Sequence, residues 1–275
     1  MLSNEVPGGI GRMPAGRYLR RAWPMVPAHA LRDAFKRRDV KINGARAGES
    51  DPVSAGDRIE LFLPDRYLPA PVETVFDDGH LIACVKPQGL PVDVDADGIG
   101  ADTLLSRVRK LHPGAQLCHR LDAQTGGLLL LAKTEAARDE AIEAFAQRRV
   151  HKTYRCLVRG TPEPAEKTLR AWLLKDAQAA HVRVLDAPQK GALPIETRYR
   201  VLSEEGGLSR LEVEIPTGRT HQIRAQLAHI GHPILGDDKY GDRALNRKYG
   251  VRAQRLWAVR LTLWDGRAFE TKEPF

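Results

Sequence analysis

Asp122 is the residue whose surroundings point most directly to chemistry. Two basic side chains, His119 and Arg120, precede it, and a short polar bend at residues 124–127 follows it. The bend leads into an unbroken apolar run at residues 128–132, which is too short to cross a membrane and predicts a strand buried on both faces. We therefore expect Asp122 at the rim of a core sheet, where a rigid scaffold can hold a reactive carboxylate. A turn in which Asp122 merely pairs with Arg120 is the alternative.

A second polar cluster, Pro-Thr-Gly-Arg-Thr-His-Gln-Ile-Arg, occupies residues 216–224. Ile223, Leu227 and Ile230 recur at helical spacing, so the pattern predicts a strand that ends at the cluster and a helix that ends at Gly231. Backbone N–H groups and a guanidinium at a helix N-terminus are well suited to bind an anion or a carboxylate.

The histidines near this cluster raise two other possibilities. His221, His229 and His232 could bind a metal ion, but their spacing matches no common ligand set. A Ser/His/Asp hydrolase would need a serine in a nucleophile-elbow context, and the sequence has none. We therefore expect neither a metal site nor a serine nucleophile.

Composition limits the class of protein. The chain has 275 residues, enough for one large domain or for one large and one small domain. Lys and Arg number 43 against 35 Asp and Glu, which favours a polyanionic partner. The three cysteines lie far apart, which predicts a reduced, cytoplasmic setting. Because residues 1–13 carry no apolar signal core, neither secretion nor membrane insertion is expected.

The N-terminal segment predicts a small basic unit of helices and strands. Helical composition covers residues 18–22 and 28–38, and short strands are predicted at 40–42 and 58–63, with a tight Asn43-Gly44 turn between them. Its candidate RNA-binding side chains are Arg32, Lys36, Arg37, Arg38 and Lys41. A solvated basic face without a ligand is the alternative.

The rest of the chain mixes helices with strands. Three prolines in residues 64–71 predict a domain boundary, which divides the chain into residues 1–67 and 68–275. Beyond it, strands are predicted at 72–86 as a hairpin and at 150–158, 195–202 and 208–215, and helices at 104–111 and 135–148. Since these elements show no regular β-α-β alternation, the fold class is α+β with a mixed, mainly antiparallel sheet flanked by helices.

Four ordered motifs resemble those of the RluA-type pseudouridine synthases. In chain order they are Lys-Pro-Gln-Gly-Leu-Pro-Val at 86–92, His-Arg-Leu-Asp at 119–122 with Thr-Gly-Gly-Leu at 125–128, Lys-Thr-Tyr at 152–154, and residues 217–224 with 231–241. The N-terminal segment resembles the αL RNA-binding module of ribosomal protein S4 type. Two residues depart from the family pattern. Gly126 stands where serine is usual, which could loosen the turn that holds Asp122, and Trp257 stands where histidine is often found, as a packing variation on the last strand.

The resemblance implies the pseudouridine synthase fold and the isomerisation of uridine in structured RNA, either ribosomal or transfer RNA. Asp122 would be the reacting carboxylate, and Arg219 would pair with it and keep it charged. Tyr154 would stack on the uracil and take up the final proton.

The resemblance also implies that Arg120 would fill the space left by the extruded nucleotide, and that the neighbouring His119 would help to bind RNA. We expect a monomer without cofactor or metal. A non-catalytic RNA-binding or RNA-chaperone protein on the same fold is the main alternative, and a phosphoesterase that uses the histidines is a more distant one.

Overall fold

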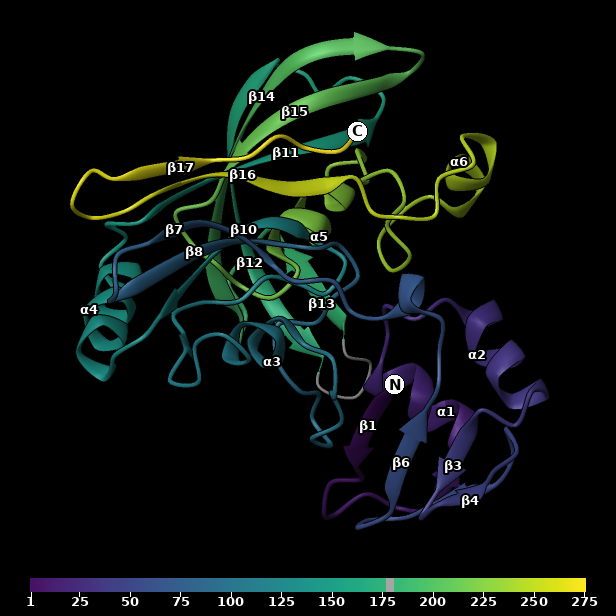
Figure 1. Cartoon of the computed structure of the whole chain (residues 1–275). Helices are drawn as coiled ribbons and strands as arrows, with labels where there is room; N and C mark the ends of the chain where they lie inside the picture. Colours follow the sequence, from purple (N-terminus) through teal and green to yellow (C-terminus); the bar gives the residue numbers. More distant parts are fainter. Residues whose placement is uncertain (177–180) are drawn as a thin grey trace. The chain divides into compact units, whose positions relative to one another are not determined.

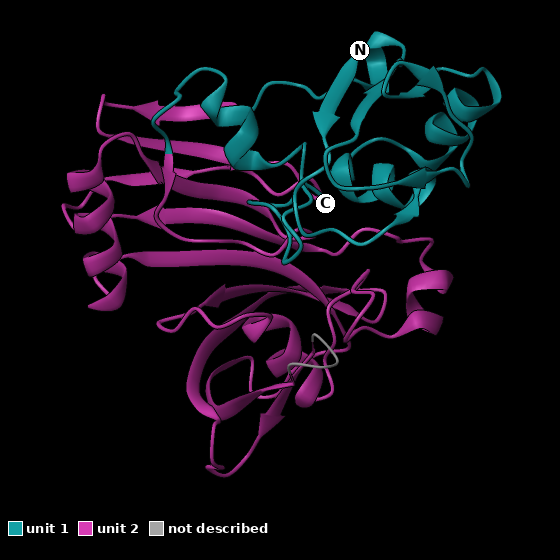
Figure 2. Ribbon diagram, turned by 90° about the horizontal axis from the view of Figure 1, so that it is seen from below, with its two compact units in different colours: residues 1–72, 89–115 teal, residues 73–88, 116–275 magenta. Residues whose placement is uncertain are grey.

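The computed structural model describes residues 1–176 and 181–275. They form two compact units, the first made of Met1–Val72 and Gly89–Ala115 and the second of Glu73–Gln88 and Gln116–Phe275 (Figure 2). The chain thus enters the second unit, returns to the first, and then stays in the second. The first unit therefore includes residues 89–115, which the division at 67/68 assigns to the other domain.

The first unit packs two helices against a small antiparallel sheet. Helix α1 (Ala15–Ala22) buries Tyr18 and Leu19, and α2 (Ala28–Lys36) buries Leu31. The sheet has the order β1 (Leu2–Glu5), β6 (Arg58–Leu61), β3 (Val40–Ile42) and β4 (Ala45–Arg46), and β2 (Met13–Pro14) pairs separately with β5 (Pro52–Val53). The predicted N-terminal α/β region is confirmed, including the strand at 40–42.

Residues 89–115 belong to the first unit because their contacts reach into it. The Asp102 N–H donates to the carbonyl of Ala22 at 2.9 Å, and Ile99 is buried in the same core as α1 and α2. Arg21 of α1 pairs with Asp95 at 2.6 Å. The segment ends in α3 (Leu104–Arg109), and the short 3₁₀ helix η1 (Asp65–Tyr67) lies near the end of the first part of the unit.

The second unit is built on one large sheet that is mixed and mainly antiparallel, as predicted (Figure 1). Its order is β13 (His181–Leu185), β12 (Glu166–Asp176), β14 (Leu193–Glu205), β15 (Leu208–Glu214), β11 (His151–Arg159), β16 (Leu256–Thr262), β10 (Gly126–Ala132), β8 (Leu81–Lys86) and β7 (Glu73–Asp77). Two short strands join it off this path, β9 (Gln116–Leu117) on β10 and β17 (Ala268–Glu270) on β16.

Strand β10, the predicted apolar run, is buried along its whole length and follows the Asp122 turn directly. It pairs antiparallel with β8 and parallel with β16. Helix α4 (Glu135–Ala146) packs Ala141 and Ala144 against β10, and α5 (Gln222–His229) packs Ile223 and Leu227 against the cluster around Tyr154 of β11. Helix α6 (Arg243–Lys248) is capped by Asp242. No described helix is long and apolar enough to cross a membrane.

Candidate active site

The turn that carries Asp122 is held by hydrogen bonds at three consecutive residues after it. The Thr125 N–H donates to the carbonyl of Asp122 at 3.0 Å and closes the turn. Lys86, at the end of β8, donates its Nζ to the carbonyl of residue 123 at 2.8 Å, and Gln88 donates its amide to the carbonyl of residue 124 at 2.7 Å. Asp122 therefore lies on a turn that cannot shift without breaking several buried or partly buried hydrogen bonds.

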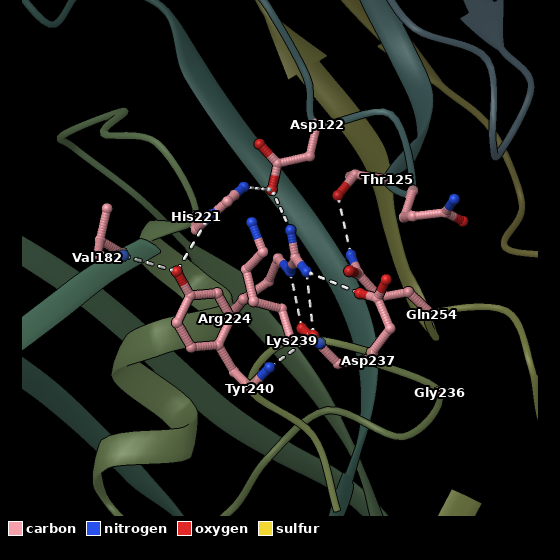
Figure 3. Close-up of polar contacts among 12 residues, drawn as sticks. Asp122, Thr125, Val182, His221, Arg224, Gly236, Asp237, Lys239, Tyr240 and Gln254 are labelled. Atoms are coloured by element: carbon pink, nitrogen blue, oxygen red, sulfur yellow. Dashed lines mark hydrogen bonds and ion pairs between the residues drawn. The ribbon is translucent and has the colours of Figure 1, made fainter. Parts of the chain in front are cut away.

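Gln254, just before β16, completes this clamp from the opposite side. Its buried amide donates to Thr125 Oγ1 at 3.0 Å (Figure 3). Its backbone carbonyl accepts from the Gln88 side chain. Both Thr125 and Gln254 are almost fully buried. Since three strands contribute, the position of Asp122 depends on the tertiary fold and not on the local sequence alone.

Lys86 is fully buried, which is rare for lysine. Burial lowers the pKa of Lys86 to about 7, although the negative charge of Asp122 acts in the opposite direction. The lysine therefore adds both a structural hydrogen bond and a charge that responds to pH near Asp122.

Arg224, in the first turn of α5, provides the ion pair for Asp122. Its Nη1 lies 3.0 Å from Asp122 Oδ2, and its Nε and Nη2 donate to the two carboxylate oxygens of Asp237 at 2.7 and 3.0 Å (Figure 3). The Arg224 side chain is only 5% exposed. Although burial opposes it, the hydrogen bond and the charge of Asp237, together with Asp122, raise the pKa of Arg224. The guanidinium is thus a fixed positive charge between two carboxylates.

This geometry corrects the predicted pairing of Asp122 with Arg219. Arg219 is exposed, and within the described residues its side chain makes no ion pair; only its backbone N–H is engaged, by Gln222 Oε1 at 3.1 Å. The reason is the start of α5 at Gln222, which leaves Arg219 in the preceding turn and directs Arg224 toward Asp122. Both arginines belong to the predicted cluster, but the sequence does not distinguish them.

The two carboxylate oxygens of Asp122 are in different environments. Oδ2 accepts from Arg224 and lies 3.8 Å from His221 Nε2, whereas Oδ1 has no hydrogen-bond partner within the described residues (Figure 3). The side chain is 21% exposed. One oxygen is therefore anchored and the other remains available to a substrate.

Tyr154, on β11, lies close enough to Asp122 for the carboxylate charge to affect the pKa of the phenol. The residue is 4% exposed, and burial, with a smaller contribution from the charge of Asp122, raises the pKa of Tyr154 well above its usual value. Its hydroxyl forms no hydrogen bond with any described residue. The structure thus places Asp122 close to Tyr154, Arg224, His221 and Lys86, and the predicted role of Tyr154 at the uracil stays a prediction.

Comparison with known proteins identifies the family. The family model for RNA pseudouridylate synthase matches residues 80–229, more than half of the chain. This chain belongs to the RluA-type RNA pseudouridine synthases. It is accordingly an RNA isomerase, with a sheet and helices of the pseudouridine synthase fold.

Named relatives and solved structures agree. The chain is 30% identical to ribosomal large subunit pseudouridine synthase C of Salmonella typhimurium over 261 residues, which are 87% of this chain and 81% of that protein. An uncharacterized RNA pseudouridine synthase of Chloroflexus aurantiacus is 33% identical over 243 residues, 82% of this chain and 75% of that protein. The structure of human RNA pseudouridylate synthase domain containing 1 covers 74% of this chain and 84% of its own at a TM-score of 0.64 and 27% identity.

His119 and Arg120 of this synthase face different environments. The His119 ring packs on Phe145 with 4.6 Å between centroids, and its Nε2 accepts the Leu130 N–H at 3.0 Å. Burial lowers the pKa of His119 to about 3, so the ring is neutral. Its Nδ1 is buried away from solvent. His119 therefore holds β10 through Leu130, and its contact with RNA stays a prediction. Arg120 is exposed and free of partners among the described residues, so its role in RNA binding stays a prediction.

The two departures from the family pattern are a single packing pair. Gly126 and Trp257 are opposite each other in the parallel β10–β16 ladder, and a Cβ atom at position 126 would overlap the Trp257 ring. The indole thus occupies the space that a serine side chain would need. Gly126 does not loosen the turn, because Thr125 beside it is held by Gln254.

The five basic residues predicted to bind RNA in the first unit differ in their partners. Arg37 pairs with Asp39 at 2.9 Å, and Lys41 lies over the ring of Phe62 at 5.3 Å. Exposed side chains that make no ion pair with the described residues are Arg32, Lys36 and Arg38. These three remain the candidates for phosphate contacts.

The three histidines considered as an alternative metal site have separate partners in the structure. His229 bonds Asp186 at 2.8 Å and His232 bonds the carbonyl of Arg159 at 2.8 Å, while His221 faces Asp122. Across residues 1–176 and 181–275, no group of three or more His, Cys, Asp or Glu side chains could hold a metal ion.

Proposed function

We propose that this synthase converts a uridine of ribosomal large-subunit RNA to pseudouridine, with Asp122 as the reacting carboxylate. The choice of RNA is supported by the similarity, over most of the chain, to ribosomal large subunit pseudouridine synthase C. The choice of residue is supported by one observation: Arg224 anchors Oδ2, while Oδ1 has no hydrogen-bond partner in the part of the chain that the structure describes.

The reaction breaks the bond between uracil N1 and ribose C1′, turns the base, joins C5 to C1′ and removes the proton from C5. A carboxylate can assist by attacking either the sugar carbon or the base, and both routes need one charged, unpaired oxygen. Asp122 offers such an oxygen, and Arg224 fixes the direction in which it points. A preorganised ion pair of this kind avoids reorganisation during the reaction.

Tyr154 is proposed to support the extruded uracil. Extrusion of a base costs a few kcal/mol, which stacking on an aromatic ring can offset in part. Because its raised pKa keeps the phenol protonated near neutral pH, Tyr154 can accept the C5 proton only after it has given up its own. Ring contact is therefore its first role, and proton transfer its second.

The first unit is proposed to hold RNA through phosphate contacts, as an S4-like module would. Arg32, Lys36 and Arg38 have solvated, unpaired charges, and such charges contribute affinity without sequence preference. Arg120, next to Asp122, would enter the space left by the target nucleotide.

The test is tritium release from large-subunit ribosomal RNA labelled at C5 of uridine. The wild-type enzyme should release tritium, and Asp122→Asn should release none while its RNA affinity stays within roughly tenfold, about 1.4 kcal/mol. Asp186→Asn, which removes an exposed carboxylate of the same unit, is the matched control and should behave as wild type. Turnover by Asp122→Asn would refute the proposed role.

The main alternative, a non-catalytic RNA-binding protein, predicts binding without tritium release by the wild-type chain. The RNA class is tested separately by mapping pseudouridine in cells that lack the gene. Loss of a modification in transfer RNA, with large-subunit RNA unchanged, would contradict the proposed substrate.

A further inference from the structure

His221 lies between Asp122 and Tyr240, hydrogen-bonded to Tyr240 through one ring nitrogen, while the other faces Asp122 from beyond hydrogen-bond distance. Its Nε2 is 3.8 Å from Asp122 Oδ2, and its Nδ1 is 2.9 Å from the Tyr240 hydroxyl (Figure 3). The Tyr240 oxygen also accepts the backbone N–H of Val182, on β13, at 3.0 Å. The three contacts form a chain from the edge strand of the sheet to the carboxylate.

The hydrogen bonds along this chain favour one tautomer of His221. The Val182 N–H can only donate, so the Tyr240 oxygen accepts there and its own proton is free for another acceptor. The acceptor at hydrogen-bond distance is His221 Nδ1. With the Tyr240 hydroxyl as donor to Nδ1, the neutral imidazole carries its proton on Nε2, and that N–H faces Asp122.

Several groups around the ring keep it neutral. Burial lowers the pKa of His221, and the positive charges of Arg224 and Lys239 act in the same direction. Asp122 and Asp237 act in the opposite direction. Tyr240, whose own pKa is raised by burial, stays protonated and continues to donate.

Tyr240 is itself firmly held. His181 packs on its ring at 4.3 Å between centroids, and the Arg224 guanidinium lies 5.4 Å from the ring centroid. Asp237, three residues before Tyr240, is the carboxylate that accepts hydrogen bonds from Arg224. The loop at residues 237–240 thus supports both donors that face Asp122.

We infer that Tyr240 and His221 form a positioning relay, in which the tyrosine holds the imidazole so that its neutral N–H faces Asp122 Oδ2 at 3.8 Å and helps Arg224, which bonds the same oxygen, to orient the carboxylate. This inference rests on the proposed role of Asp122. A neutral donor orients the carboxylate and leaves its charge intact, whereas an imidazolium would pair with the carboxylate and weaken it as a nucleophile. Protonation of His221 should therefore slow the reaction.

Tyr240→Phe tests the relay directly. It removes the hydrogen bond that favours the neutral ring, so the pKa of His221 should rise, and the acid limb of the single-turnover rate should move to higher pH. We expect the rate at neutral pH to fall about tenfold, with the RNA dissociation constant unchanged. The rate is measured by tritium release at saturating enzyme between about pH 5 and pH 9.

Tyr199→Phe is the matched control. Its hydroxyl donates to the carbonyl of Pro164 at 2.9 Å, so the variant also loses a tyrosine hydrogen bond in the same unit. It should keep the wild-type acid limb. A second variant, His221→Gln, retains an N–H donor that cannot titrate and should lose the part of the acid limb that belongs to His221.

The outcomes separate the two proposals. Either of two results would overturn the relay while leaving Asp122 as the reacting group. One is a wild-type pH profile for Tyr240→Phe, and the other is an equal loss of single-turnover rate in Tyr240→Phe and Tyr199→Phe at every pH. Turnover by Asp122→Asn would overturn the proposed function itself.

Discussion

Arg224 and two arginines of the first unit differ in burial and in their partners. Arg224 is buried and bonded to Asp122 and Asp237, whereas Arg32 and Arg38 of the first unit are exposed and make no ion pair with the described residues. A buried charge depends on its partners for solvation, so it holds one geometry and resists salt. An exposed charge is solvated by water and can exchange it for a phosphate. We therefore expect the buried arginine to orient Asp122 and the exposed arginines to recruit RNA.

The largest effect should follow removal of the buried guanidinium. Arg224→Met leaves Asp237 and Asp122 without their shared partner, which should destabilise the fold by about 3–5 kcal/mol and abolish turnover. Arg219→Met removes the exposed arginine of the same motif and should change stability by no more than about 0.5 kcal/mol. Urea unfolding and tritium release measure the two effects.

Arg224→Lys is a second variant, needed because Arg224→Met could lose activity simply by unfolding. It keeps the charge but cannot bridge both carboxylates in one plane, so it should fold and still lose about 100-fold in single-turnover rate. If Arg219→Lys lost more activity than Arg224→Lys, the exposed arginine would be the catalytic one and our assignment would be wrong.

The second effect concerns packing beside the Asp122 turn. Gly126→Ser places a Cβ in the Trp257 ring and should destabilise the synthase by about 1–3 kcal/mol. The same serine in a Trp257→His background should be tolerated better, because the smaller ring leaves room. Thermal unfolding of the two single variants and the double variant measures the coupling. Additive losses would show that the two positions do not compensate each other.

The third effect is a pH dependence of stability from Lys86. Folding lowers its pKa from 10.5 to about 7, so between these values the unfolded chain binds a proton that the folded chain does not. The free energy of unfolding should therefore rise with pH in this window, by at most about 1.4 kcal/mol per pH unit.

Lys86→Met removes this contribution and should flatten the rise. Urea unfolding at several pH values tests it, with Lys133→Met as the control, because Lys133 is only partly buried and pairs with Asp77. Identical pH slopes for wild type and Lys86→Met would show that the lysine is charged when folded.

Local sequence patterns predict helices and strands better than they predict the contacts within the site. The strand at residues 40–42 and the helix that ends near Gly231 follow from periodicity and turn residues, which act over a few positions. The choice between Arg219 and Arg224 depends on Asp122, 102 residues before Arg224, so no local pattern reveals it. The hydrogen bond from Leu130 to His119 is not predicted for a similar reason, since Leu130 lies in the strand beyond the turn.

Other differences also arise from long-range contacts. Strand β12 was not predicted because the segment Leu-Arg-Ala-Trp-Leu-Leu-Lys has helical composition, and pairing with β14 and β13 on both sides overrides it. Residues 89–115 follow the linker in sequence but share a core with α1. Gly126 and Trp257 are 131 positions apart in the sequence, so only the parallel pairing of β10 with β16 shows that they form one packing pair.

Neutralising the exposed charges of the first unit should have the smallest effect on the reaction. It also tests most directly whether these charges bind RNA. A triple variant, Arg32→Gln, Lys36→Gln and Arg38→Gln, should bind RNA more weakly, and the slope of log affinity against log salt should become shallower by nearly one unit for each lost phosphate contact. Arg37→Gln is the control, since that arginine is already paired with Asp39 and should change the slope little. At saturating enzyme the tritium-release rate of the triple variant should match wild type, because Asp122 and Arg224 are untouched. An unchanged salt slope would return these three charges to an ordinary solvated surface, and only the buried arginine would then have a role in the reaction.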